Sequence, residues 1–104
     1  MRTDLPPGLQ AAQAVHAAFS FAHRYPADTA YWMASSNFLV IVAVGDEDSL
    51  IALSGEAIRR GITTVVIREP DCNDEVTAVA LTPGKMAQKL CANLPLALRR
   101  PAMT

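Results

Sequence analysis

The chain has 104 residues, of which 51% are hydrophobic and 18% charged, and its formal net charge is −1. This length suits one domain, and the composition excludes a disordered chain because it combines enough apolar residues for a core with little charge. The charge balance also lacks the basic excess of a general nucleic-acid binder, so contact with RNA would need arginines and lysines gathered on one face.

The cysteine spacing and the apolar runs indicate the cellular compartment of the protein. Cys72 and Cys91 are far apart, without a CxxC pair or a nearby histidine cluster, so we expect reduced thiols and neither a metal site nor a cofactor. No apolar run reaches the ~18–20 residues that span a bilayer. Met1 to Asp4 lack the apolar stretch of a signal peptide. These features predict a cytoplasmic protein without membrane contact.

The first long element that the sequence predicts is a helix over residues 9–24. It is rich in alanine, the best helix former, and it follows a rigid Pro-Pro-Gly corner at residues 6–8. Val15, Phe19 and Ala22 recur at spacings of three and four, so we expect them to form its buried stripe.

A proline and then an apolar run mark the next two elements. Pro26 ends the first helix, because proline disfavours helix in the residue before it, and begins a shorter one. The cluster Tyr31-Trp32-Met33 on that helix is expected in the core or at a dimer contact. Residues 38–44 form a continuous apolar run, which predicts a strand covered on both faces.

The second half of the chain alternates helices and strands. Acidic residues at 46–48 suit the start of a helix that reaches Arg60, and Gly61 suits its C-terminal end. Two strands are predicted over residues 62–68 and 76–81, and a last helix over 83–93. This order favours an α/β domain whose sheet is mainly parallel.

Several segments resemble the archaeal-eukaryotic (type 2) peptidyl-tRNA hydrolases. The most specific is Ala11–Ala18, which is similar to the family's AAQxxHA helix. Other segments resemble family motifs in the family's order, and the likeness runs from Arg2 to Leu98. These are Arg2–Leu5, Asp46–Leu50, Arg60–Ile62 and Val76–Pro83.

The resemblance implies a fold and an activity. The fold would be a three-layer α/β/α domain over residues 1–98, around a mixed, mainly parallel sheet of about four strands, with a C-terminal tail at 99–104. The activity would be hydrolysis of the ester between a peptidyl or aminoacyl group and tRNA. The partner would then be peptidyl-tRNA.

Four residues are the candidates for catalysis. His16 could act as general base toward water, because histidine titrates nearest to neutral pH, or it could be a hydrogen-bonded surface residue. Gln13 could orient a carbonyl or water, or be an ordinary helix glutamine. Asp4 could orient His16, or form a turn. Glu69 ends a strand, where α/β proteins place functional groups, or is a solvated loop carboxylate.

This sequence departs from the family pattern at two places near that site. Leu9 stands where the family has an active-site lysine. The loop Glu69–Glu75 is shortened, has lost the family's arginine and threonine, and holds four acidic residues that would repel tRNA phosphates. Arg2 and Arg24 are the nearest cations for phosphate contact, unless they are solvated surface residues.

The third departure concerns the first strand. Family members have apolar residues before the segment that corresponds to Arg2–Leu5, whereas this sequence starts at Met1. Either this strand is truncated, or the true start of the protein lies further upstream. A truncated strand would leave sheet edge or apolar surface that needs cover, so we expect a homodimer.

Two functions therefore remain open. The first is a hydrolase of the peptidyl-tRNA hydrolase type with weak or altered activity. The second is a catalytically inactive relative that binds a protein or a small ligand. The intact AAQxxHA helix favours the first, and the missing lysine and acidic loop favour the second.

Overall fold

The computed structural model describes residues 1–98 and has four α-helices and two strands in that range. In chain order the elements are α1 (Pro7–Arg24), α2 (Pro26–Ala34), α3 (Glu47–Arg59), β1 (Thr64–Glu69), the 3-10 turn η1 (Pro70–Cys72), β2 (Glu75–Leu81) and α4 (Lys85–Cys91). The predicted mixed α/β class is confirmed. The tail predicted at 99–104 lies outside the described residues.

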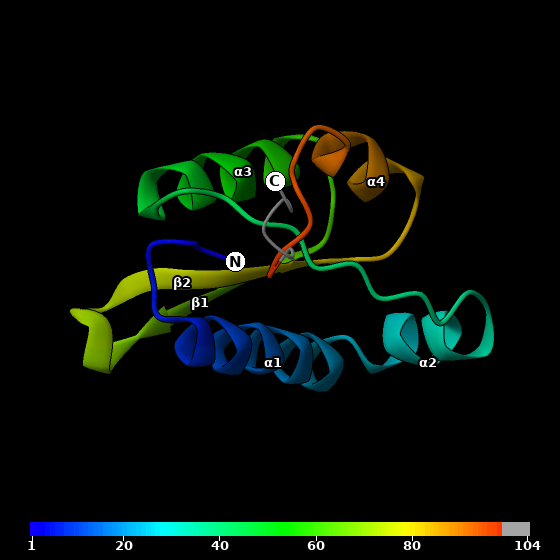
Figure 1. Ribbon diagram of the computed structural model, residues 1–104. Helices are drawn as coiled ribbons and strands as arrows, with labels where there is room; N and C mark the ends of the chain where they lie inside the picture. The colour runs from blue at the N-terminus through cyan, green and yellow to red at the C-terminus, as the bar shows by residue number, and fades with distance from the viewer. Residues whose placement is uncertain (99–104) are drawn as a thin grey trace, which may run out of the picture.

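The helices lie on both sides of the two strands. In Figure 1, α1 runs below them, and α3 and α4 lie above. Both α1 and α3 contact β2. The core cluster consists of three buried residues from different parts of the chain, Val44, Leu50 and Val76. Three partly buried residues pack against it: Val66, Val79 and Leu94. No helix among residues 1–98 combines the length and the apolar character needed to cross a membrane.

The sheet differs from the predicted one in strand number and direction. β1 and β2 pair antiparallel, from Thr64 opposite Leu81 to Glu69 opposite Glu75. The few residues between them allow only a hairpin, because a parallel pair needs a long crossover. Elsewhere in residues 1–98 the pairing is limited to two isolated bridges, Arg2 with Val44 and Val42 with Leu96. The four-stranded, mainly parallel sheet is therefore not found in this part of the chain.

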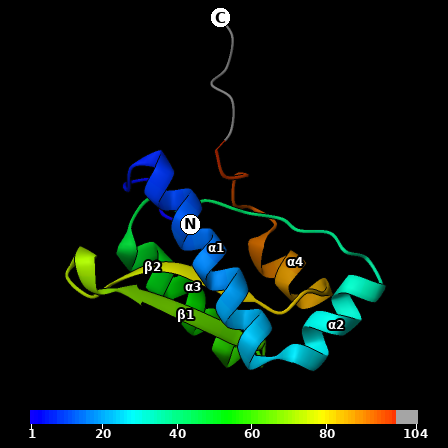
Figure 2. The same cartoon turned by 90° about the horizontal axis from the view of Figure 1, so that it is seen from below.

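Residues 38–44 form an extended connection from α2 to α3 and not the predicted buried strand (Figure 2). Phe38 is 79% exposed and Leu39 is 68% exposed, whereas Ala43 and Val44 are buried. Backbone pairing with neighbouring segments reaches only residues 41–44. A run of apolar residues becomes a strand only where neighbours satisfy its backbone, and here they are missing over its first half.

The buried side of α1 is also different from the predicted stripe. Val15 and Phe19 are 53% and 72% exposed. The residues that α1 buries are Gln10, Gln13, Ala17 and Phe21. They too follow helical spacing, and the two glutamines can be buried because their amides are hydrogen-bonded. Hydrophobicity alone therefore selected the wrong face of this helix.

The aromatic cluster of α2 does not enter the core. Tyr31 is 76% exposed and Met33 is 63% exposed. The indole Nε1–H of Trp32 donates to the carbonyl of Phe38 at 2.7 Å. This contact fastens the end of α2 to the extended connection that follows, and the predicted core role of the cluster is wrong.

Candidate active site

The side chain of Gln13 on α1 is hydrogen-bonded to one residue of each strand, Glu69 of β1 and Thr77 of β2. The Thr77 hydroxyl donates to Gln13 Oε1 at 2.7 Å, and Gln13 Nε2 donates to Glu69 Oε2 at 3.1 Å. An ionised carboxylate can only accept, so the NH₂ end of the amide must face Glu69. Gln13 and Thr77 are 4% and 0% exposed, so both lie inside the α1–sheet contact. This arrangement leaves the amide one defined orientation.

Glu69 keeps capacity for a further hydrogen bond. It ends β1, and its Oε1 accepts the backbone N–H of Asp71 at 3.2 Å in the turn that follows. A carboxylate has about four acceptor positions, and these two bonds use two of them. Glu69 is half-buried, so a water or a substrate hydroxyl can reach it. The structure thus brings together Gln13 and Glu69, two of the four candidates for catalysis that the sequence predicted.

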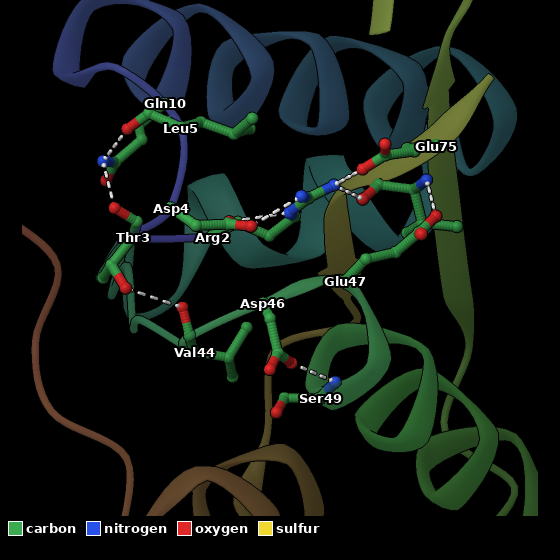
Figure 3. A network of polar contacts seen from close by, with 11 residues as sticks. Arg2, Thr3, Asp4, Leu5, Gln10, Val44, Asp46, Glu47, Ser49 and Glu75 are labelled. Carbon is green, nitrogen blue, oxygen red and sulfur yellow. Dashed lines mark hydrogen bonds and ion pairs between the residues drawn. The ribbon is translucent and has the colours of Figure 1, made fainter. Parts of the chain in front are cut away.

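Arg2 forms the second polar group of this region (Figure 3). Its Nε and Nη2 donate to the Asp4 carboxylate at 2.9 and 2.7 Å. Its Nη1 donates to Glu75 at 2.7 Å and to the Val76 carbonyl at 3.1 Å. The Arg2 residue is 5% exposed, so these contacts fasten the start of the chain to β2. Such a guanidinium suits a structural role better than contact with phosphate.

The same contacts explain two pKa shifts. The hydrogen bond from Arg2 lowers the pKa of Asp4, because it favours the ionised carboxylate. The bond to Asp4 likewise raises the pKa of Arg2, with a smaller contribution from Glu75. Glu75 is the one acid of the 69–75 loop that the structure pairs with a cation within residues 1–98. Because Arg2 neutralises Glu75, the loop presents less negative charge to a ligand.

Arg2→Met is expected to destabilise the fold by about 1.5–3 kcal/mol, the usual contribution of hydrogen bonds to charged groups. Urea unfolding at pH 7 measures this difference. Because the folded-state pKa of Asp4 is lowered, its contribution is present above the ordinary aspartate value of about 3.9 and is lost as the pH falls below it. The gap between wild type and variant should therefore shrink at acid pH, and a gap that stays constant would contradict this assignment.

The remaining candidates make no side-chain hydrogen bond to Gln13, Glu69 or Thr77 within residues 1–98. Asp4 binds Arg2, and no hydrogen bond joins it to His16 within residues 1–98. His16 follows Gln13 by one helical turn and is exposed, with no hydrogen-bond partner in the part of the chain that is described. Arg24 is exposed at the end of α1, about 16 Å further along the helix axis than Gln13 at the usual rise. Leu9, one turn before Gln13, is half-buried in the first turn of α1.

Sequence reasoning missed Thr77. It lies between Val76 and Ala78 in an apolar strand, where a threonine is ordinary because β-branched residues favour strands. The available signal was a polar residue within a predicted strand that is otherwise apolar. Its partner is 64 residues away in sequence, so only the packing of α1 on the sheet reveals the contact.

Two shallow hollows lie elsewhere on the molecule. One is next to the start of α4, between Gly61, Thr82 and Met86, and the other lies between Thr3, Gly45 and Leu94. Neither lining includes Gln13 or Glu69. Residues 1–98 contain no group of three His, Cys, Asp or Glu side chains placed to hold a metal ion.

A comparison with protein families decides the assignment. The model of the family Peptidyl-tRNA hydrolase PTH2 matches residues 1–96. The chain belongs to the PTH2 family. The match spans the Gln13, Glu69 and Thr77 cluster as well as Arg2, so the PTH2 assignment covers the whole candidate site. A search of the curated proteins found no match to this chain.

Proposed function

We propose that this PTH2 member hydrolyses the ester between a peptidyl or aminoacyl group and the 3′ ribose of tRNA, and that it does so in the cytoplasm. The observation that carries the proposal is the Gln13 amide, fixed between Thr77 and Glu69 on the helix that bears the family motif. The two hydrogen bonds offset the cost of burying this amide, and they impose one orientation on it. An amide fixed in this way suits a site that must hold a reacting group in one orientation.

The proposed reaction uses water as the nucleophile. His16 takes a proton from the water, whose oxygen attacks the ester carbonyl. The tetrahedral intermediate then expels the ribose oxygen, which takes that proton from the imidazolium. Gln13 keeps a second N–H after its bond to Glu69, and this N–H or the Glu69 carboxylate orients the water or the ester. Asp4 supports the site through Arg2 and not by contact with His16.

The proposed activity is slow, because Leu9 stands where the family has its lysine. Removing one group that stabilises developing negative charge typically costs about 10²–10³ in rate. Arg24 is the remaining exposed candidate for phosphate contact on α1. The basic test measures release of the peptidyl group from purified peptidyl-tRNA by the full chain. The protein must be free of RNase, and heat-inactivated protein serves as the blank.

Thr77→Val tests the role of the buried hydroxyl. The variant keeps the shape of the side chain but leaves Gln13 Oε1 without its donor, which should cost about 1–3 kcal/mol of stability. It should also lower kcat more than it raises KM, because the amide loses its imposed orientation. Thr77→Ser, which keeps the hydroxyl, should recover most of kcat. Equal loss of kcat in both variants would show that the hydroxyl does not act through Gln13.

A second candidate function is a non-catalytic family relative that binds a protein partner. The exposed apolar side chains favour it, notably Val15 and Phe19 on α1. The same side chains support the homodimer expected from the sequence, since exposed apolar surface of this kind is often covered by a partner. Light scattering at micromolar concentration tests the dimer, and a clean monomer would exclude it at that concentration.

A further inference from the structure

An exposed phenylalanine lies on α1 beyond the candidate site. Phe19 is 72% exposed, whereas Phe21 is 8% exposed and its ring pairs with Tyr25 at 5.2 Å between the centroids. Within residues 1–98 no aromatic ring pairs with Phe19. Figure 2 views the molecule from the side of α1, which lies in front of both strands. The ring of Phe19 is therefore open to a ligand that approaches this side of the helix.

Helical geometry connects this ring to the candidate site. Residues three apart on a helix are neighbours, and each such step advances about 4.5 Å along the axis and turns about 60° around it. Gln13, His16 and Phe19 form such a row on α1. Gln13 is buried, whereas His16 and Phe19 are exposed. The row thus runs from the fixed amide, past the proposed base, to the open ring.

The charges around the ring suit a polyanion. α1 has no acidic residue among its 18 positions, and Arg24 lies at its end. Between Asp4 and Asp46 the chain has a single acid, Asp28, which belongs to α2. A phosphate chain that follows α1 therefore meets no carboxylate of this helix, and like-charge repulsion is avoided.

The proposed substrate brings a nucleotide base to this part of α1. The reacting ester joins the acyl group to the 3′ ribose, and the same ribose carries the terminal base of the tRNA. That base is therefore close to the carbonyl on which His16 is proposed to act. Unpaired bases bind proteins by stacking on exposed aromatic side chains, and every base has a face for this contact. Phe19 offers such a side chain one step along the row from His16.

We propose that Phe19 is a substrate-binding residue, on whose ring the terminal base of the tRNA 3′ end stacks while the ester lies at His16. Phe19 contributes affinity and not chemistry, because it contacts the base and no reacting atom. This inference rests on the proposed hydrolase function and names the part of the substrate that α1 recognises.

Two measurements on the full chain test the stacking, one with turnover and one without. The first is steady-state hydrolysis of peptidyl-tRNA. The second is the Kd for a short RNA oligonucleotide that ends in CCA, the 3′ sequence of tRNA. Phe19→Ala should raise both KM and Kd by about 5–150-fold, the range for one stacked base, and leave kcat nearly unchanged.

Three further variants separate stacking from general apolar contact. Phe19→Trp keeps an aromatic face and should keep KM and Kd near those of the wild type. Phe19→Leu is apolar but has no ring, so it should resemble Phe19→Ala. Val15→Ala is the matched control, because Val15 is also an exposed apolar residue of α1 but lies outside the row. It should leave both constants unchanged.

Other results would overturn the proposal. If Phe19→Leu binds the oligonucleotide as the wild type does, apolar contact alone suffices and no base stacks there. Turnover by Phe19→Ala with an unchanged KM would remove the ring from the binding site and leave the hydrolase intact. Binding that depends on Phe19 without any turnover would sink the hydrolase and retain the stacking site. If Phe19→Ala binds RNA normally but has a lower mass in light scattering, a second copy covers the ring instead.

Discussion

Leu9→Lys is expected to raise the rate of peptidyl-tRNA hydrolysis by up to about 10²–10³-fold, the effect of restoring one group that stabilises developing negative charge. Leu9 and Gln13 are four residues apart on α1, so their side chains lie on one face of the helix. Leu9 is half-buried, so a lysine at this position can bury its apolar stem as Leu9 does and extend its ammonium group toward the Gln13–Glu69 pair. The family motif has its lysine at the corresponding place.

Two control variants separate this effect from general attraction of tRNA. Leu9→Met keeps an uncharged side chain of similar size and should leave the rate near that of the wild type. Ala11→Lys adds the same charge on an exposed side of α1 and should change KM more than kcat. A gain in kcat confined to Leu9→Lys supports the hydrolase. A gain shared by both lysine variants would show that net charge, and not the position of the lysine, limits the reaction.

His16→Ala is expected to lower kcat by about 10²–10⁴-fold, the range for loss of a general base. His23 offers a matched control, because it is also an exposed histidine and lies in the last turn of the same helix. His23→Ala should retain the rate of the wild type. The two variants should unfold at similar urea concentrations, since neither ring is buried, so a difference in activity cannot come from folding.

The result of this comparison also separates the two candidate functions. If turnover is present and His16→Ala leaves it unchanged, the base is another group, and Glu69 becomes the first alternative because its carboxylate has free acceptor positions. If neither the wild type nor Leu9→Lys shows turnover, the chain is a non-catalytic relative. The Gln13 amide would then serve only to join α1 to the sheet.

The sequence predicted the helices better than the sheet, for a local reason. Pro26 separates α1 from α2, and Asp46 begins α3 by accepting the N–H of Ser49 at 2.8 Å. Signals of this kind act between residues close in the chain, so they can be recognised without knowing the fold. The burial of residues 38–41 depends instead on which backbone lies next to them. That neighbour is not encoded in the apolar run itself.

By itself, the sequence determined the mixed α/β class, the order of the helices and the family motif that points to Gln13 and His16. The tertiary structure decided which face of α1 is buried, that Asp4 binds Arg2, and that Gln13 joins Thr77 and Glu69. The physical reason is that a buried polar side chain needs a specific partner, and here the partner of Gln13 comes from a strand 64 residues away. Hydrophobic periodicity measures only the tendency to leave water, so it cannot identify a buried amide whose cost is offset by such hydrogen bonds.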